Sequence, residues 1–380
     1  MKVLVLNYEY PPVGGGGGRL CRRVCAALAT RGHAVRVVTA GVGSLPSREV
    51  REGVEILRPR SFRRREDTCS VPEMGLYLAT ALPRALALAR KWKPDVIHAH
   101  FVVPTGLLAL AIHKLTGIPF VVTAHLGDVP GGVPEQTRGL FRLAAPIARK
   151  IWHAASGRSA VSAHVAGLAA TAFGEPAEII PNGVPAIAEP PARAGTGRLE
   201  AVWAGRFSVQ KNPLLAVRAM RALPEGMAVH LRMIGEGPLH EEARREAGES
   251  GGRISFCGWL AEDRVREIFS TSDVLVMTSL HEGLPMVGVE ALWHGLAILG
   301  TRIGGLADVV IDGKNGSLLE PDPTAFARAL ALLAENPMVL ASQRSASRSL
   351  APQFDFESSV DRYEHLLASA AGNRKASRQF

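Results

Sequence analysis

Glu282 and Glu290 are the two carboxylates of this chain whose spacing most clearly suggests chemistry. Seven residues separate them, and the segment between them begins with the Gly-Leu-Pro-Met run at 283–286. The apolar run Val274–Met277 before them is typical of a buried strand, and the run after them is typical of a helix ending near Gly295. A strand-to-helix turn directs backbone N–H groups and the positive end of the helix dipole to one point, which favours a phosphate. The segment therefore predicts a sugar-nucleotide site, with the diphosphate on the turn and sugar hydroxyls on the two acids.

Two cations form a second candidate group. Arg206 and Lys211 follow Gly205, at the end of a strand predicted over Leu199–Ala204. A turn separates the two side chains, so both can converge on one diphosphate. Arginine binds such a group as a fork and lysine binds it as a point charge. The pair therefore predicts an anion-binding site at the carboxyl end of this strand.

Glycine runs follow two further predicted strands. Gly14–Gly18 lies between the strand Lys2–Leu6 and the first helix, and Gly304 and Gly305 follow the strand Ala297–Gly300. Glycine lets a ligand approach the backbone closely. Both runs are therefore candidate cradles for a phosphate or a sugar. The first run is not a Walker loop, because no Lys-Ser or Lys-Thr pair follows it.

Histidines end two predicted strands of the first half. His125 follows a strand predicted at 119–124, and Asp128 comes three residues later. The imidazole could form a hydrogen bond or move a proton, and the carboxylate could contact an acceptor hydroxyl. His98 and His100 end a neighbouring strand and are interpreted as structural residues. The histidines, acids and cysteines show no metal-ligand spacing, so neither a metal nor another cofactor is expected.

The elements that position these residues follow a regular rhythm. Short apolar runs alternate with helical patterns along both halves of the chain, which predicts an α/β fold of two doubly wound, Rossmann-like domains with a cleft between them. We predict a first domain at 1–185, a Pro-, Gly- and Ala-rich linker at 186–198, a second domain at 199–354, and a helix and tail at 355–380 that packs back toward the first domain. The tryptophans predicted to lie in the second core are Trp203, Trp259 and Trp293.

Composition limits the class of protein. Of the 380 residues, 47% are hydrophobic and 21% are charged, as in folded soluble proteins. No apolar run reaches the roughly 18 residues that a membrane-spanning helix needs. The N-terminal apolar run is too short for a signal peptide, and the cysteines show no disulfide pattern. A cytoplasmic protein is therefore expected.

The net charge of +9 is unevenly distributed. Residues 1–190 hold 23 Lys and Arg against 13 Asp and Glu, whereas the remaining residues hold 21 against 22. The densest cluster favours an anionic acceptor or a peripheral contact with an anionic membrane surface at the inner face. This cluster comprises Arg58, Arg60, Arg63, Arg64 and Arg65. No nucleic acid partner is expected, because aromatic residues, which could stack on bases, make up only 6% of the chain.

Taken together, these motifs resemble glycosyltransferase family 4, whose members are retaining enzymes with the GT-B fold. The matching features are Glu282 and Glu290 as E-x7-E, Gly205, Arg206 and Lys211 as G-R-x4-K, the glycine run 14–18, the segment Ile180–Val184, and His125. Two positions depart from the family pattern. Asn212 stands where glycine is common, and Leu126 separates His125 from Gly127.

The resemblance implies a role for each matching residue. Four would be catalytic: Arg206 and Lys211 would neutralise the departing diphosphate, Glu282 would contact the donor sugar, and His125 would line the acceptor side. Glu290 would hold the nucleotide ribose. The other donor-binding residues would be Gly15, Gly16, Gly205, Gly283, Leu284, Pro285, Met286, Gly304 and Gly305. The acceptor side would include Asp128 and Gly17.

The resulting hypothesis is a retaining, metal-independent glycosyltransferase that moves a sugar from a nucleotide-diphosphate sugar, with UDP as the default nucleotide, to a hydroxyl acceptor. Front-face attack assisted by the leaving diphosphate is the mechanism that the resemblance implies. The alternatives are a sugar-nucleotide epimerase on the same architecture and a non-catalytic nucleotide-sugar-binding protein. The acceptor stays open between an envelope glycan, a lipid-linked sugar and a small metabolite.

Overall fold

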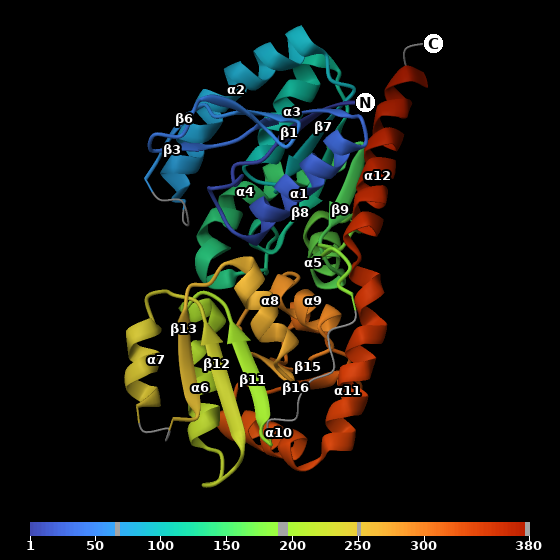
Figure 1. The fold of residues 1–380 in the computed structure, drawn as a ribbon. Helices are drawn as coiled ribbons and strands as arrows, with labels where there is room; N and C mark the ends of the chain where they lie inside the picture. The colour runs from blue at the N-terminus through green and yellow to red at the C-terminus, as the bar shows by residue number, and fades with distance from the viewer. Residues whose placement is uncertain (65–68, 189–196, 249–251, 377–380) are drawn as a thin grey trace. The chain divides into compact units, whose positions relative to one another are not determined.

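The computed structural model describes residues 1–64, 69–188, 197–248 and 252–376. These residues form two compact α/β units, which are coloured by position along the chain in Figure 1. Unit 1 comprises residues 1–182 and 357–380, and unit 2 comprises residues 183–356. Most of the predicted linker, at 189–196, lies outside the described residues.

Unit 1 is built on an eight-stranded sheet in the order β10-β9-β8-β7-β1-β2-β5-β4. All neighbouring strands pair in parallel except β4 and β5, which pair antiparallel. The strands are β1 Lys2–Leu6, β2 Ala34–Val38, β4 Arg48–Arg51, β5 Val54–Leu57, β7 Val96–His100, β8 Phe120–Ala124, β9 Gly157–Ala160 and β10 Glu178–Ile179. Every residue of β7 and β8 is buried. Because successive side chains point to opposite faces, both faces of the sheet are covered at its centre.

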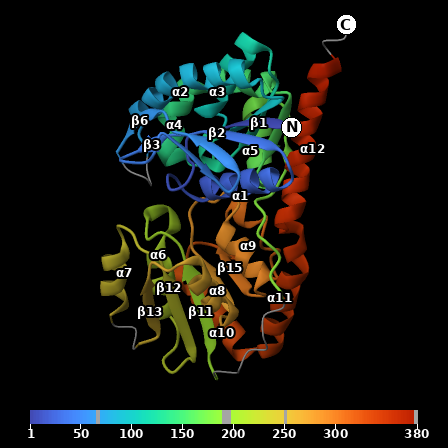
Figure 2. The ribbon, with the colours of Figure 1, turned by 45° about the horizontal axis from the view of Figure 1, so that its top comes forward.

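The helices of unit 1 alternate with its strands, as the sequence predicted. They are α1 Gly16–Thr30, α2 Val71–Trp92, α3 Thr105–Thr116, α4 Pro134–Ala154, α5 Ala163–Phe173 and α12 Phe356–Ala376. The sequence predicted no element at α2, nor at the small two-stranded sheet of β3 Gly41–Val42 and β6 Arg60–Arg63. The helix α2 contains Pro83 and begins with a capping box between Ser70 and Glu73. It lies beside α3, as Figure 2 shows.

The last helix, α12, is joined to the rest of unit 1 by ion pairs on Arg31. The Arg31 guanidinium lies 2.7 Å from Glu357, 2.6 Å from Asp361 and 2.8 Å from Glu364. The three acids are spaced at three or four residues, so they share one face of the helix. His33 adds a contact of 2.7 Å to Glu364.

Unit 2 contains six parallel strands in the order β13-β12-β11-β14-β15-β16, and Figure 1 shows β11, β12 and β13 side by side. The strands are β11 Leu199–Ala204, β12 Val229–Ile234, β13 Ile254–Gly258, β14 Val274–Met277, β15 Ala297–Thr301 and β16 Gly316–Leu319. The helices are α6 Pro213–Arg221, α7 His240–Ala247, α8 Glu262–Ser270, α9 Met286–Trp293, α10 Pro323–Glu335 and α11 Pro337–Leu350. The predicted strands Leu199–Ala204, Val274–Met277 and Ala297–Gly300 match β11, β14 and β15 closely, but β16 and α11 were not predicted. The core includes Trp203, Phe207, Met233 and Phe326.

Two predictions about exposure are wrong. Arg58 and Arg63 were expected on a basic surface, but both are buried: Arg58 donates 2.7 Å to Glu49, and Arg63 donates 3.2 Å to the carbonyl of Tyr8. Their guanidinium groups join loops within unit 1 instead of facing solvent. Arg60 and Arg64 are exposed, and Arg65 lies outside the described residues. The basic cluster is thus smaller at the surface than the sequence indicated.

Trp259 is the second exception. Trp203 and Trp293 are buried, as predicted, but Trp259 is 71% exposed. It follows Gly258, the last residue of the edge strand β13. An edge strand has a neighbour on one side only, so a residue just beyond its end is covered less than one at the centre of the sheet.

Candidate functional site

The carboxylate of Glu282 is held in place at the carboxyl edge of the unit 2 sheet. Its Oε1 accepts from Lys211 Nζ at 2.5 Å and from the Ser279 hydroxyl at 2.6 Å. Glu282 is 7% exposed and Ser279 is also buried, whereas a larger part of the Lys211 side chain reaches solvent. Charge-assisted hydrogen bonds of this kind are the stronger ones in proteins. The carboxylate therefore has a fixed orientation, and Lys211 lies beside it.

Hydrogen bonds to backbone carbonyls join the loop that carries Lys211 to the segment after β14. The amide of Leu280 donates to the carbonyl of Gln210 at 2.7 Å, and the hydroxyl of Thr278 donates to the carbonyl of Lys211 at 3.0 Å. The Gln210 side chain donates to the carbonyl of His281 at 3.0 Å. The two motifs that the sequence placed about 70 residues apart are thus one structural assembly.

Asn212 stands where the family pattern has glycine, and its backbone adopts a conformation that glycine favours. Its φ of 46° lies in the left-handed region, which glycine adopts freely and asparagine tolerates better than most residues. Asn212 also precedes Pro213, the first residue of α6. The turn after Lys211 therefore keeps the geometry that glycine would give.

Two glycines allow neighbouring loops to approach at this edge. A Cβ added to Gly305 would overlap the carbonyl oxygen of Glu282, and one added to Gly235 would overlap the carbonyl oxygen of Gly205. Gly235 also has a φ of 128°, which side chains rarely allow. The sequence singled out Gly205, Gly304 and Gly305 but missed Gly235, since a lone glycine in a loop carries little signal.

The helix α9 begins directly after the Gly-Leu-Pro turn. Pro285 is its N-cap residue, and Met286 is the first helical residue. The carbonyl of Pro285 accepts from Gly288 and Val289 at 2.9 and 3.1 Å. The amides of Met286 and Val287 precede any intrahelical carbonyl that could accept from them, so the turn offers N–H groups to an anion.

The other predicted residues of the turn lie around this helix start. Gly283 and Leu284 precede it, and Leu284 is buried. Glu290 is half-buried and lies one turn inside α9. Arg206 is exposed at the end of β11. The structure therefore brings together Glu282, Lys211 and the start of α9. Arg206 follows the end of β11, and Glu290 lies further along α9.

The far end of α9 is fixed by α11, which the sequence did not predict. Arg344 donates to the carbonyl of Gly295 at 3.0 Å, Ser347 donates to that of Leu296 at 2.6 Å, and Arg348 donates to that of Trp293. These carbonyls lie at the last residue of the helix, Trp293, and just beyond it, where cations and donors are favourable. The candidate site lies at the start of α9. The hydrogen bonds from α11 therefore fix the helix that carries the site.

In unit 1, the imidazole of His125 lies at the end of β8 in a closely packed position. It is 6% exposed, and its ring centroid is 4.4 Å from that of Phe101. A Cβ added to Gly17 would lie 3.3 Å from its Cε1 and Nδ1, so glycine leaves room there. Its Nε2 is 3.4 Å from Nδ1 of His100. Burial lowers the pKa of His125 to about 4, so the ring is neutral at pH 7.

Asp128 has a different place from the one suggested by the sequence. Its carboxylate accepts from the amide of His125 at 2.6 Å and from the amide of Val102, and the side chain is 3% exposed. Burial raises its pKa to about 8, against the opposing effect of these two hydrogen bonds. The carboxylate was expected to face an acceptor hydroxyl. In the structure its two oxygens accept hydrogen bonds from the backbone amides of His125 and Val102.

The glycine run forms the start of α1. Gly15 is the N-cap residue and Gly16 begins the helix, so Gly16 and Gly17 lie in its first turn. The amide of Gly15 donates to Oε2 of Glu9 at 3.4 Å. A Cβ added to Gly18 would overlap the backbone of Glu9. The sequence missed Glu9 as a neighbour of this loop, because no spacing rule connects a strand-end acid with a glycine run.

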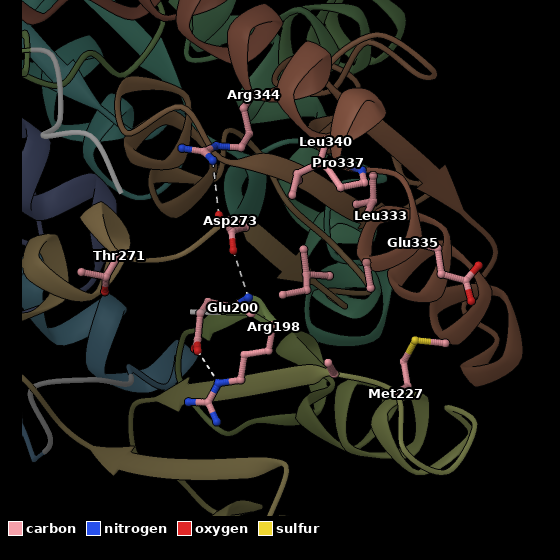
Figure 3. A pocket seen from close by; sticks show the side chains of 14 residues that line it. Arg198, Glu200, Met227, Thr271, Asp273, Leu333, Glu335, Pro337, Leu340 and Arg344 are labelled. Carbon is pink, nitrogen blue, oxygen red and sulfur yellow. Dashed lines mark hydrogen bonds and ion pairs between the residues drawn. The ribbon is translucent and has the colours of Figure 1, made fainter. Parts of the chain in front are cut away.

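A cavity of unit 2 is remote from these residues. It has a volume of about 470 Å³ and is shown in Figure 3, where Arg198 pairs with Glu200 and Arg344 pairs with Asp273. Its lining includes the first residues of β11. All strands of this sheet are parallel, so the cavity lies at the amino edge, and the residues of the two motifs lie at the opposite edge. The motifs, not this cavity, mark the candidate site.

The described part of the chain contains no group of three or more His, Cys, Asp or Glu side chains arranged to hold a metal ion. Nor does it contain a helix with the length and apolar character needed to cross a membrane.

Comparisons with known proteins point to one family. The family described as "Glycosyltransferase Family 4" matches residues 14–186, and that described as "Glycosyl transferases group 1" matches residues 198–336. The chain is 28% identical to the glycogen synthase of Mycobacterium tuberculosis, over 99% of this chain and 96% of that protein. It is also 28% identical to the 2-deoxystreptamine glucosyltransferase of Streptomyces kanamyceticus, over 87% and 93%.

Solved structures share the fold. Sucrose-phosphate synthase from Thermosynechococcus elongatus superposes with a TM-score of 0.82 at 21% identity, covering 96% of this chain and 98% of that one. Anabaena Alr3699/HepE in complex with UDP-glucose gives a TM-score of 0.72 at 19% identity, covering 97% and 100%. The predicted GT-B architecture, with two Rossmann-like units, is thereby confirmed.

Proposed function

The chain belongs to glycosyltransferase family 4, and from that premise we propose that it moves a sugar from a nucleoside-diphosphate sugar to a hydroxyl acceptor, with retention of configuration and without a metal. The observation that carries this proposal is the Glu282 carboxylate, held by Lys211 and Ser279 beside the start of α9. This arrangement offers a cation, a fixed carboxylate and backbone N–H groups at one edge of one sheet.

We assign the donor to unit 2. The diphosphate would lie at the start of α9, where Lys211 and Arg206 supply positive charge. Glu282 would accept hydrogen bonds from hydroxyls of the donor sugar, and Glu290 would accept them from the ribose. Gly305 supports this site because any side chain there would displace the backbone of Glu282.

The chemical step needs charge stabilisation more than a nucleophile. The bond between the anomeric carbon and the diphosphate oxygen breaks, and the acceptor oxygen bonds to the same face of that carbon. The acceptor proton passes to an oxygen of the departing diphosphate. Fixed cations and helix N–H groups stabilise the leaving charge in the place where a metal would otherwise act.

We assign contacts on the acceptor side to unit 1. His125 is neutral and closely packed, so it can form a directed hydrogen bond with a sugar hydroxyl. Gly17 leaves space beside the ring. Asp128 acts through His125 by holding its backbone amide, and therefore serves as a positioning residue.

The donor nucleotide is proposed as UDP, supported by the similarity to a protein that was solved with UDP-glucose. The acceptor is the less constrained partner. The similarity to a 2-deoxystreptamine glucosyltransferase and to a glycogen synthase makes a small polyol and an α-glucan the first two acceptors to test.

A thermal-shift screen in the presence of EDTA tests this proposal. The ligands are UDP, GDP, ADP and dTDP with their common sugar conjugates. A ligand at about 100 times its Kd adds roughly 2.7 kcal/mol to the free energy of unfolding, which shifts the melting temperature by a few degrees. A shift with one nucleotide in EDTA supports the donor site, and NMR of the product anomer then tests retention. No shift with any nucleotide, or conversion of the sugar without an acceptor, would contradict the proposal.

A further inference from the structure

Three histidines of unit 1 form a buried row that ends at the proposed sugar contact. His98 and His100 come from β7 and His125 follows β8. All three are buried, with ring centroids 4.2 Å apart between His98 and His100 and 5.6 Å apart between His100 and His125. The sequence interpreted the first two as structural. The row raises the question of whether either of them acts through the third.

The imidazole of His100 makes one polar contact among the residues that the structure describes. Its Nδ1 lies 3.4 Å from Nε2 of His125, and its own Nε2 is buried without a hydrogen-bond partner. His98 differs, because its Nε2 is 2.8 Å from the hydroxyl of Thr123, which lies 2.8 Å from that of Ser159. The polar interaction of His100 is thus directed at His125, whereas that of His98 is directed away from it.

The pair is neutral at pH 7. Burial lowers the pKa of His125 to about 4, and burial together with the neighbouring histidines lowers the pKa of His100 well below its ordinary value. A neutral imidazole has one N–H and one lone pair. With the N–H on one of the two facing nitrogens and the lone pair on the other, the two rings form a hydrogen bond that restricts rotation of the His125 ring about its Cβ–Cγ bond.

Other contacts also restrict His125. Phe101 packs against the ring at 4.4 Å, and a Cβ added to Gly17 would lie 3.3 Å from it. Asp128 holds the backbone amide of His125, and in the same capping box the His125 side chain faces the backbone N–H of Asp128. Packing and the capping box thus place the ring, and His100 adds the polar partner at its Nε2.

We propose that His100 is a positioning residue that holds the imidazole of His125 in the orientation needed to contact the bound sugar. The inference rests on the proposed function, since it assumes that His125 contacts substrate. It adds a residue that the family motifs do not include and that never touches substrate itself.

The test compares His100→Leu with His98→Leu as its matched control. Both residues lie on β7, both are buried and both substitutions remove an imidazole, so their losses of stability should be similar. We expect His100→Leu to lower kcat about 10- to 100-fold, with KM for the donor changed less than about threefold, because misplaced groups of this kind cost rate. We expect His98→Leu to stay within about threefold of the wild-type kcat. Equal losses in both variants would overturn the proposal.

A conservative variant and a double variant sharpen the result. His100→Asn places an amide atom near the position of Nδ1, so it should recover most of the lost kcat. The double variant His100→Leu/His125→Ala should be no slower than His125→Ala alone, because the effect of His100 passes through His125. Additive losses would overturn the proposal, as would normal turnover of His125→Ala.

The experiments distinguish failure of the proposed function from failure of the positioning role of His100. If the wild-type protein transfers sugar from a nucleotide donor and His100→Leu keeps its kcat, only the positioning role is wrong. If the wild-type protein binds no nucleotide, the proposed function is wrong and the positioning role falls with it.

Discussion

The two units position their candidate residues at the same kind of place but by different physical means. Glu282 in unit 2 is held by a charged partner, Lys211, which is partly open to solvent. His125 in unit 1 is held by neutral partners and close packing, and it is buried. The first arrangement suits binding of a charged diphosphate, and the second suits a directed contact with an uncharged hydroxyl.

Because of this difference, substitutions in the two units should lower activity for different reasons. Removing a charge from unit 2 removes attraction to the ligand itself, whereas changing unit 1 mainly alters geometry. We therefore expect the largest losses of activity in unit 2 and smaller ones in unit 1.

The largest effect is expected at Lys211. Lys211→Ala removes the cation beside the diphosphate and leaves the buried Glu282 without its charged partner. We expect kcat to fall about 100- to 1,000-fold, as for loss of one preorganised transition-state contact. Steady-state kinetics with a saturating donor measure this, with Arg328→Ala on α10 as an exposed cationic control. Turnover within about threefold of wild type in Lys211→Ala would contradict the assignment.

A second test uses the backbone contact under Glu282. Gly305→Ala would push against the carbonyl oxygen of Glu282, so we expect nucleotide affinity to fall at least about 10-fold. Isothermal titration calorimetry measures the affinity. Gly167→Ala is the control, because a Cβ at Gly167 meets nothing within 4 Å. Unchanged affinity in Gly305→Ala would show that the two loops do not need to touch.

In unit 1, Asp128→Asn tests the support of His125. The amide has only one oxygen to accept from the two backbone N–H groups of Val102 and His125. We expect a loss of about 1–3 kcal/mol in the free energy of unfolding, from urea denaturation, together with a fall in kcat. A stable variant with normal kcat would mean that this carboxylate does not position His125.

The smallest expected effect is a change in how the free energy of unfolding depends on pH. Burial lowers the pKa of His98 to about 3, whereas an unfolded histidine titrates near pH 6.5. Between these values the unfolded chain binds more protons, so the contribution of His98 to stability is present above about pH 6.5 and is lost as the pH falls. His98→Asn should make the loss of stability on acidification shallower, by up to about 1.4 kcal/mol per pH unit below pH 6. The opposite contribution of Asp128 cancels in this comparison. Identical slopes for the two proteins would contradict a buried, neutral His98.

The sequence predicted the fold and the strand and helix on either side of the 283–286 turn well, for identifiable reasons. The apolar runs around Glu282 and the turn at 283–286 are local signals, and the structure places β14 and α9 within a residue or two of them. Lys211 was paired with this turn by motif and lies 2.5 Å from Glu282. The roles of these residues stay proposals.

The sequence was less informative where contacts join distant segments. The hydrogen bonds from α11 to the end of α9 connect residues about 50 positions apart, and His100 meets His125 across two strands. Arg58 and Arg63 look like surface cations because their partners, Glu49 and the Tyr8 carbonyl, are set by the fold. Such pairings depend on strand order, which local patterns do not determine.

The most direct test of the central claim is a calorimetric titration of the wild-type protein with UDP and with UMP, both in EDTA. If unit 2 holds a diphosphate with Lys211, Arg206 and the start of α9, UDP should bind at least about 10-fold more tightly than UMP without any metal. Equal affinities for the two nucleotides, or UDP binding that appears only when a divalent metal is added, would contradict the account.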